Sequence, residues 1–175
     1  MINHELKCIF VHIIKTGGVS IATGLNMQAK QCHLTASEIR TKVGDATWNR
    51  YFKFSIIRNP WDKMVSSYHF NHHKWVPEGT PFEDYIRRWG KGQQITRFPP
   101  QNSAYINEDL DFIGHFETLE ADFQTILSHL RHPPLKLGHL NRSRHRNYRD
   151  YYSDETRQIV ENQFTDDIRR WGFRF

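Results

Sequence analysis

Short apolar runs, each followed by a turn, set the pattern of hydrophobic and polar positions along the chain. Residues 8–11 are apolar throughout, and residues 51–57 are aromatic and β-branched with alternation over the first half, so both predict strands. Residues 111–116 predict a third strand. Stretches that can form helices begin at Ser20 and after Pro60, behind the first two strands. The pattern predicts helices around a short sheet, and three strand signals are too few to order that sheet.

Helix signals account for most of the remaining chain. A capping-box pattern begins at Thr35, and Gly44 can close the helix that it opens. A second capping box begins at Thr80, with Pro81 at the first helical position. Ser153 can cap the last helix. The predicted helices are residues 35–44, 80–90, 119–130 and 153–171.

The segment VHIIKTGGVS, residues 11–20, joins the first predicted strand to the first predicted helix. A strand, a Gly-rich turn with one Lys and two hydroxyls, and then a helix is a pattern with which proteins cradle a phosphate. Gly17 and Gly18 let backbone N–H groups approach the anion, and Lys15 can lie against the group being transferred. Because Lys15 precedes the glycines, the segment predicts a phosphate loop that differs from the Walker pattern GxxxxGK[ST].

A second segment, RNPWDKMVSSY at residues 58–68, follows the second predicted strand. Arg58 lies at the carboxyl end of that strand, and the pair Asn59-Pro60 favours a turn that begins the next helix. Ser66 comes about two helical turns later. Open α/β sheets bind ligands at the carboxyl ends of their strands, so we expect Arg58 and Ser66 to face the same crevice as the first loop.

HIIKTGGVS (residues 12–20) resembles the 5′-phosphosulfate loop of sulfotransferases that use 3′-phosphoadenosine-5′-phosphosulfate (PAPS), and residues 58–68 resemble their 3′-phosphate segment. The likeness is to the carbohydrate branch, with heparan and chondroitin sulfotransferases and small bacterial relatives. One departure is Ile14, where the family usually has Pro. The resemblance continues through residues 30–40, 112–117, 141–143, 148 and 151–152.

The resemblance implies a P-loop-like α/β fold, a three-layer sandwich with a central parallel sheet flanked by helices, in a single domain over residues 1–175. It implies transfer of a sulfuryl group from PAPS to a hydroxyl acceptor, expected to be a carbohydrate, with adenosine 3′,5′-bisphosphate as product and no metal. Lys15 would stabilise the leaving oxygen and the sulfonate. Arg58 and Ser66 would hold the 3′-phosphate. The expected cofactor-binding residues are Lys15, Thr16, Gly17, Gly18, Val19, Ser20, Arg58, Ser66 and Ser143.

The general base is expected among the 11 histidines, because a His titrating near neutrality suits that task. His33 is preferred, since it lies between the two motifs and directly before a capped helix. His12, at the start of the loop, is the second candidate and equally a structural support. Three further histidines, at 69, 72 and 73, have the spacing of a zinc pair on one helix face, but they lack a Cys or carboxylate partner at a recognised spacing.

Composition fits a small enzyme. No apolar run approaches the roughly 20 residues of a membrane span, residues 1–7 lack the basic start and long apolar core expected of a signal peptide, and the two cysteines make no disulfide framework. We therefore expect a cytoplasmic protein or an excised domain.

The net charge of the chain is +5, and much of the positive excess lies in residues 139–149. That segment predicts a loop over the cofactor or acceptor; a solvated basic loop is the plainer alternative, and nucleic acid is not expected because no recognised module is present.

Two other function classes stay open. A nucleotide-dependent kinase with an atypical phosphate loop would need ATP and a divalent metal, yet no Walker-type Lys or metal-binding Asp at a strand end accompanies the loop. A non-catalytic protein that binds anions or glycans would keep the loop without transferring any group. Nucleotide preference and dependence on Mg²⁺ separate the kinase from a sulfotransferase. Cofactor binding without transfer to any acceptor, and no change in His33→Ala, would indicate the non-catalytic protein.

Overall fold

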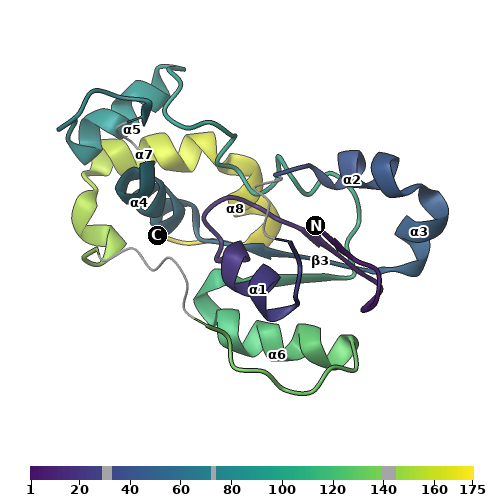
Figure 1. Ribbon diagram of the computed structural model, residues 1–175. Coiled ribbons are helices and arrows are strands. Elements are labelled where there is room, and N and C mark those ends of the chain that lie inside the picture. The colour runs from purple at the N-terminus through teal and green to yellow at the C-terminus, as the bar shows by residue number, and fades with distance from the viewer. Residues whose placement is uncertain (29–32, 72–73, 139–144) are drawn as a thin grey trace. The chain divides into compact units, whose positions relative to one another are not determined.

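The structure is a computed structural model of the 175-residue chain (Figure 1). It describes residues 1–28, 33–71, 74–138 and 145–175. The chain forms two compact units: unit 1 contains Met1–Arg58 and Asn102–Arg142, and unit 2 contains Asn59–Gln101 and Ser143–Phe175. The expectation of one domain over the whole chain stays a prediction.

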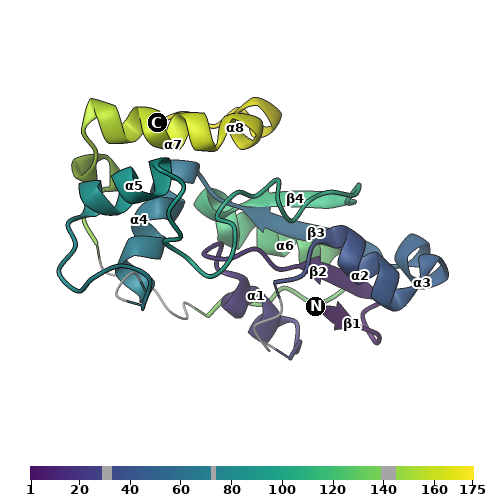
Figure 2. The same cartoon turned by 90° about the horizontal axis from the view of Figure 1, so that it is seen from above.

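Unit 1 is built on a four-stranded mixed sheet with the strand order β1-β2-β3-β4 (Figure 2). The strands are β1 (Ile2–Asn3), β2 (Cys8–Val11), β3 (Phe52–Ile57) and β4 (Phe112–His115). The three predicted strands are confirmed as β2, β3 and β4, and they are parallel. The expectation of a wholly parallel sheet is wrong at one edge, where β1 pairs antiparallel with β2. Residues 4–7 are too short a connection for a parallel crossover, so they form a hairpin.

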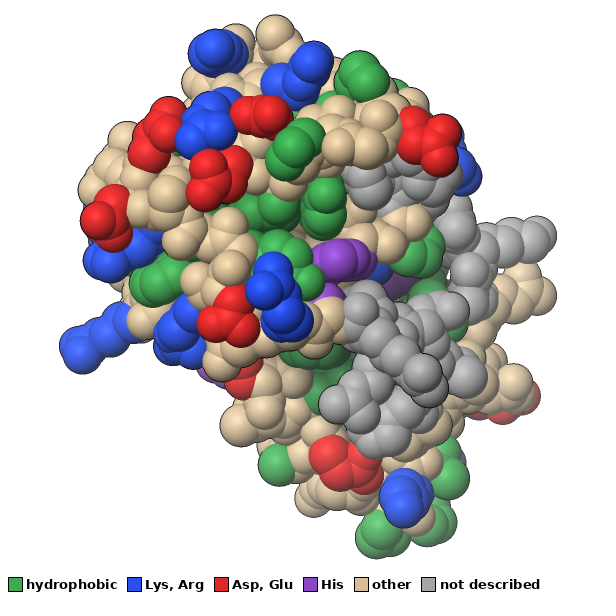
Figure 3. Space-filling view, turned by 90° about the vertical axis from the view of Figure 1, so that its left-hand side faces the viewer, with side chains coloured by type: hydrophobic (Ala, Val, Ile, Leu, Met, Phe, Trp, Pro, Cys, Tyr) green, Lys and Arg blue, Asp and Glu red, His purple; other side chains and the backbone are tan. Residues whose placement is uncertain are grey.

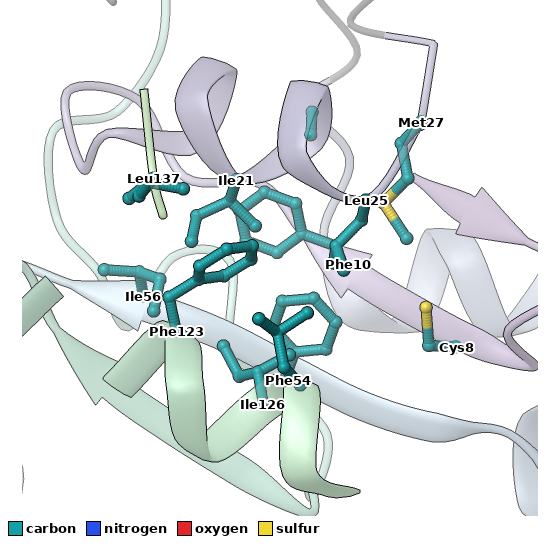
Figure 4. Close-up of a cluster of buried hydrophobic side chains, with 12 residues drawn as sticks. Cys8, Phe10, Ile21, Leu25, Met27, Phe54, Ile56, Phe123, Ile126 and Leu137 are labelled. Atoms are coloured by element: carbon teal, nitrogen blue, oxygen red, sulfur yellow. The ribbon is translucent and has the colours of Figure 1, made fainter. Parts of the chain in front are cut away.

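One face of this sheet is covered by α1 (Gly18–Gly24) and α6 (Leu119–His129). Phe10 of β2 and Phe54 of β3 stack with their ring centroids 5.0 Å apart, and Phe123 of α6 belongs to the same cluster. Each such side chain contributes about 1.5–3 kcal/mol when fully buried. The labelled members of the cluster are Cys8, Phe10, Ile21, Leu25, Met27, Phe54, Ile56, Phe123, Ile126 and Leu137 (Figure 4).

The opposite side of the sheet from α6 carries α2 (Ala36–Val43) and α3 (Asp45–Arg50), as Figure 1 shows. Thr35 forms the predicted capping box at the start of α2. Trp48 of α3 is buried, and Lys53 Nζ of β3 lies 5.8 Å from the centre of its ring. Side chains alternate along a strand, so Lys53 and Phe54 point to opposite faces. Unit 1 is therefore an α/β unit whose mixed sheet is flanked by helices.

Unit 2 consists of helices in its described residues. They are α4 (Pro60–Asn71), α5 (Phe82–Gly90), the short 3₁₀ helix η3 (Tyr148–Tyr151), α7 (Asp154–Gln163) and α8 (Thr165–Trp171). The predicted turn at Asn59 is confirmed, because its side-chain oxygen accepts a hydrogen bond from Trp61 N at 3.1 Å and α4 follows. Trp61 is buried in one apolar cluster with Tyr85 of α5 and Val160 of α7. This indole therefore belongs to the core of unit 2.

Two details of the helices in unit 2 differ from their predictions. The capping box predicted at Thr80 does not form, because Pro81 is the N-cap of α5 and Thr80 Oγ1 donates instead to Pro77 O at 2.6 Å. Ser153 caps α7 as predicted, but Phe164 (φ −112°, ψ 23°) interrupts the helix. The last predicted helix is therefore two helices, α7 and α8.

The surface of α5 and α7 carries charges of both signs. Arg87 lies 2.8 Å from Glu83, 3.0 Å from Asp84 and 2.9 Å from Glu155. Figure 3 shows described basic and acidic side chains interspersed on this face of the molecule. Nucleic-acid surfaces gather positive charge on one face, so this surface lacks that signature among its described residues.

None of the described helices combines the length and the apolar character that crossing a membrane requires.

Candidate functional site

The predicted phosphate loop is a tight turn between β2 and α1. Lys15 (φ 61°) and Gly17 (φ 76°) both have left-handed backbone conformations, and Thr16 Oγ1 donates to Ile13 O at 3.0 Å across the turn. Ser20 N donates to Gly17 O at 3.0 Å where α1 begins. Successive backbone N–H groups in such turns form concave sites for anions, and the first N–H groups of a helix have no acceptor within that helix. The turn therefore combines left-handed residues with the start of a helix, two features found in such anion sites.

Packing also restricts both glycines of the loop. A Cβ atom on Gly17 would lie 2.8 Å from Leu119 Cδ2, and a Cβ on Gly18 would lie 2.0 Å from His12 Cδ2. Real carbon atoms do not approach so closely, because these distances lie well inside their contact distance of about 3.5 Å. The sequence motif assigned these glycines to the phosphate. The structure adds that the backbone of the loop is held against its own unit at both positions.

Arg58 joins the second motif to this loop. The residue is 5% exposed, and NH1 of its guanidinium donates to Lys15 O at 2.9 Å. Its Cζ atom lies 3.8 Å from the centre of the Phe116 ring, which is a close cation–π contact. Asn102 Nδ2 donates to Arg58 O at 3.1 Å and fixes the backbone at the end of β3. Arg58 therefore holds the residue that carries the candidate catalytic ammonium group.

Arg58 also acts electrostatically on Lys15. Burial, and then the neighbouring positive charge of Arg58, lower the pKa of Lys15 to about 8. Both effects disfavour the charged form of the amine. A bound anion would favour that form again, so the arrangement predicts that anion binding and protonation of Lys15 are coupled.

The two histidines considered as bases lie against each other. Their ring centroids are 4.6 Å apart, and His33 Nδ1 donates to the backbone oxygen of His12 at 3.1 Å. A carbonyl oxygen only accepts, so Nδ1 of His33 carries the proton, and Nε2 of the neutral ring carries the lone pair that a base needs. His12 is 5% exposed; burial, and then the charge of His33, lower its pKa to about 3. The geometry therefore favours His33 over His12 as the base.

Unit 1 thus brings together the loop, Arg58, His12 and His33, but it does not contain every predicted site residue. Ser66 lies on α4 in unit 2 and is 2% exposed, so its contact with a 3′-phosphate stays a prediction. Ser143 lies outside the described residues, as do His72 and His73. His69 Nε2 lies 2.9 Å from Tyr151 Oη. Within the described ranges, no group of three or more His, Cys, Asp or Glu side chains could hold a metal ion.

The basic segment near the C-terminus is described from residue 145 onward. Arg149 Cζ lies 4.6 Å from the centre of the Tyr148 ring, and Arg146 Cζ lies 5.2 Å from that of Tyr151. Both guanidinium groups therefore lie over aromatic rings of unit 2. Their contact with a cofactor or acceptor stays a prediction.

Two side chains of the site, those of Asn102 and Phe116, were not predicted from the sequence. Asn102 is fully buried and lies far along the chain from Arg58, whose backbone it holds. Tyr105 O, a few residues later, accepts from Ala36 N at 2.8 Å, directly after the segment that carries His33. Phe116 follows β4 and lies under the Arg58 guanidinium. No local pattern marks Asn102, whereas Phe116 is the last residue of the third predicted strand and could have been found as a residue near a carboxyl end.

Comparison with known proteins adds one relative. A protein of Archaeoglobus fulgidus, described only as uncharacterized, is 28% identical over 114 residues, which are 63% of this chain and 93% of that protein. No protein-family model matches the chain. No solved structure matches it either. The chemistry of the site is therefore inferred from its own residues.

Proposed function

We propose that the protein is a PAPS-dependent sulfotransferase with a P-loop-like, three-layer fold, and that its acceptor is a carbohydrate hydroxyl. The observation that carries the proposal is the 2.9 Å hydrogen bond from Arg58 to Lys15 O, which joins the two sequence motifs. These motifs follow neighbouring parallel strands, β2 and β3, whose carboxyl ends share an edge of the sheet. Ligands of open α/β sheets bind at that edge. Two cations beside a Gly-rich turn suit a donor that carries a phosphosulfate.

The residues of unit 1 have distinct tasks in this proposal. The bound donor supplies the sulfuryl group, whose S–O bond to the 5′-phosphate breaks as the acceptor oxygen bonds to sulfur. Lys15 stabilises the charge that develops on the phosphate oxygen. The backbone N–H groups of residues 16–19 hold the phosphate, and Arg58 fixes Lys15 and adds a second positive charge. His33 takes the proton of the acceptor hydroxyl at Nε2. Positioning and electrostatics supply most of the acceleration, as in phosphoryl transfer.

Nucleotide binding tests this proposal directly. Adenosine 3′,5′-bisphosphate is expected to raise the free energy of unfolding by about 2.7 kcal/mol at about a hundredfold excess over its Kd, with or without Mg²⁺. The measurement is thermal unfolding with the bisphosphate, ADP and ATP side by side, each with and without Mg²⁺. If ATP raises the unfolding temperature only with Mg²⁺, and the bisphosphate does not raise it, the result would favour a kinase over a sulfotransferase. No shift with any nucleotide would contradict both.

A pair of arginine variants locates the binding site. Arg58→Ala is expected to abolish the shift given by the bisphosphate, because it removes a charge and releases Lys15 O. Arg50→Ala is the matched control, since Arg50 also belongs to unit 1 and its Cζ lies 5.9 Å from the Tyr51 ring centre, but it precedes β3 instead of following it. An unchanged shift in Arg58→Ala would exclude this end of the sheet as the nucleotide site.

Removal of the base should slow the reaction without weakening nucleotide binding. His33→Ala is expected to lower kcat by about 10²–10⁴-fold, the usual range for general base catalysis, and to leave the Kd for adenosine 3′,5′-bisphosphate nearly unchanged. Transfer of radiolabelled sulfate from PAPS to heparan and chondroitin oligosaccharides measures the rate. His4→Ala serves as the control. Like His33, His4 forms a hydrogen bond through Nδ1, in this case with Tyr51 Oη at 2.8 Å, but it precedes β2 in the sequence. An unaltered rate in His33→Ala would remove His33 from the mechanism.

A further inference from the structure

His12 is a buried imidazole with an unsatisfied nitrogen. It follows β2 directly, and its ring packs between Phe10, at 5.5 Å between centroids, and His33, at 4.6 Å. Its Nδ1 atom is buried and has no hydrogen-bond partner among the described residues. The opposite edge of the ring faces the loop, because a Cβ atom on Gly18 would lie 2.0 Å from His12 Cδ2 and 2.2 Å from His12 Nε2. One ring nitrogen is therefore sealed inside the unit, and the other lies against the loop.

The position of the ring proton follows from these surroundings. Buried N–H donors without an acceptor are rarer in proteins than acceptors without a donor, so the sealed Nδ1 is expected to lack the proton. The neutral ring then carries its proton on Nε2, the nitrogen that faces the loop. The pKa of about 3, which burial and then His33 produce, keeps the ring neutral over the working range of pH. A neutral imidazole of this kind donates a hydrogen bond without gaining or losing a proton.

We propose that His12 is an anion-binding residue, which donates a hydrogen bond from Nε2 to the phosphate or phosphosulfate group held by the loop. The inference rests on the proposed function, because it requires an anion in the loop. It assigns different tasks to the two histidines: His33 exchanges a proton with the acceptor, and His12 keeps its proton throughout the reaction. It also gives a chemical reason for a polar side chain at a position that is buried like a core residue.

Two variants of similar size separate hydrogen bonding from packing. His12→Met and His12→Gln both lack the ring, but only Gln retains an N–H donor. His12→Met is expected to weaken binding of adenosine 3′,5′-bisphosphate about 10- to 100-fold, the range for a hydrogen bond to a charged group, and His12→Gln should bind about tenfold more tightly than His12→Met. Equal losses in the two variants would reduce His12 to a packing role, and no loss would remove it from the site. Wild-type protein that binds neither the bisphosphate nor inorganic pyrophosphate would overturn the proposed function and this inference together.

Nuclear magnetic resonance of the ring nitrogens tests the proton position without any variant. The long-range ¹H–¹⁵N spectrum of the wild-type protein is expected to show His12 as the neutral tautomer protonated at Nε2, unchanged between about pH 5.5 and pH 8. The titratable groups that act on this ring are His33 and the amino group of Met1, and titration of either should shift the signals without protonating Nδ1. Adenosine 3′,5′-bisphosphate should shift the Nε2 signal. A proton on Nδ1, or a charged ring, would overturn the inference even if the nucleotide binds.

Discussion

Replacement of Lys15 by Met is expected to lower the rate of sulfuryl transfer by about 10²–10³-fold, the usual effect of removing one group that stabilises developing charge. Met keeps most of the length of the side chain and removes the ammonium group. The fold should survive the change, because burial and Arg58 already disfavour the charged amine at this position. Transfer of radiolabelled sulfate from PAPS to an oligosaccharide panel measures the rate, and circular dichroism checks the fold. A rate within about threefold of the wild type would contradict the role of Lys15.

The same variant should remove a dependence on pH. The pKa of Lys15 falls from its ordinary 10.5 to about 8 in the folded chain, so between these values the unfolded chain binds more protons and stability rises with pH. A bound anion favours the ammonium, so affinity for adenosine 3′,5′-bisphosphate should decrease as pH rises above about 8. Both trends should be absent in Lys15→Met. They should persist in Lys7→Met, a control at another lysine of unit 1 with a left-handed backbone (φ 50°).

The elements of unit 1 that the sequence predicted are those with strong local signals. Three signals, the apolar run of β2, the alternation in β3 and the capping box at Thr35, each span only a few consecutive residues. Local chemistry therefore determines these elements. The left-handed turn at Gly17 was likewise visible as a Gly-rich segment. The edge strand β1 was missed because two residues carry too little periodicity to be seen.

The contacts that assemble the site are long-range. The sequence predicted that Arg58 and the first loop face the same crevice, but it did not reveal the individual contacts. Asn102 and Arg58 are 44 positions apart in the sequence, and Arg58 and Lys15 are 43 positions apart. No local pattern spans such separations. The motif correctly marked Arg58 as a residue at the end of a strand, and its assignment to a phosphate stays a prediction. Its bond to Lys15 O and its position over Phe116 follow from packing. The sequence therefore indicates which residues are present at the site, while tertiary structure decides what each one holds.

The close approach of Gly18 to His12 leads to the second large effect. Gly18→Ala is expected to destabilise the protein by about 2–3 kcal/mol, because the new Cβ would lie 2.0 Å from a buried ring that must move. Gly18 has no left-handed backbone, so the ring is the expected obstacle. In a His12→Ala background the same substitution should cost almost nothing or stabilise the helix by up to about 1 kcal/mol, since Ala has a higher helix propensity than Gly. Denaturant unfolding of the four proteins in this cycle measures the coupling.

A second glycine of α1 provides the control for this cycle. Gly24→Ala is also expected to be destabilising, because its Cβ would lie 2.8 Å from Phe123 Cζ, but His12→Ala should not rescue it. Rescue of Gly18→Ala alone would show that the imidazole of His12 fills the space beside the loop, and that glycine at 18 is required by that ring as well as by an anion. An equal cost of Gly18→Ala in both backgrounds would mean that the ring is not the obstacle, and His12 would then lie too far from the loop to bind its anion.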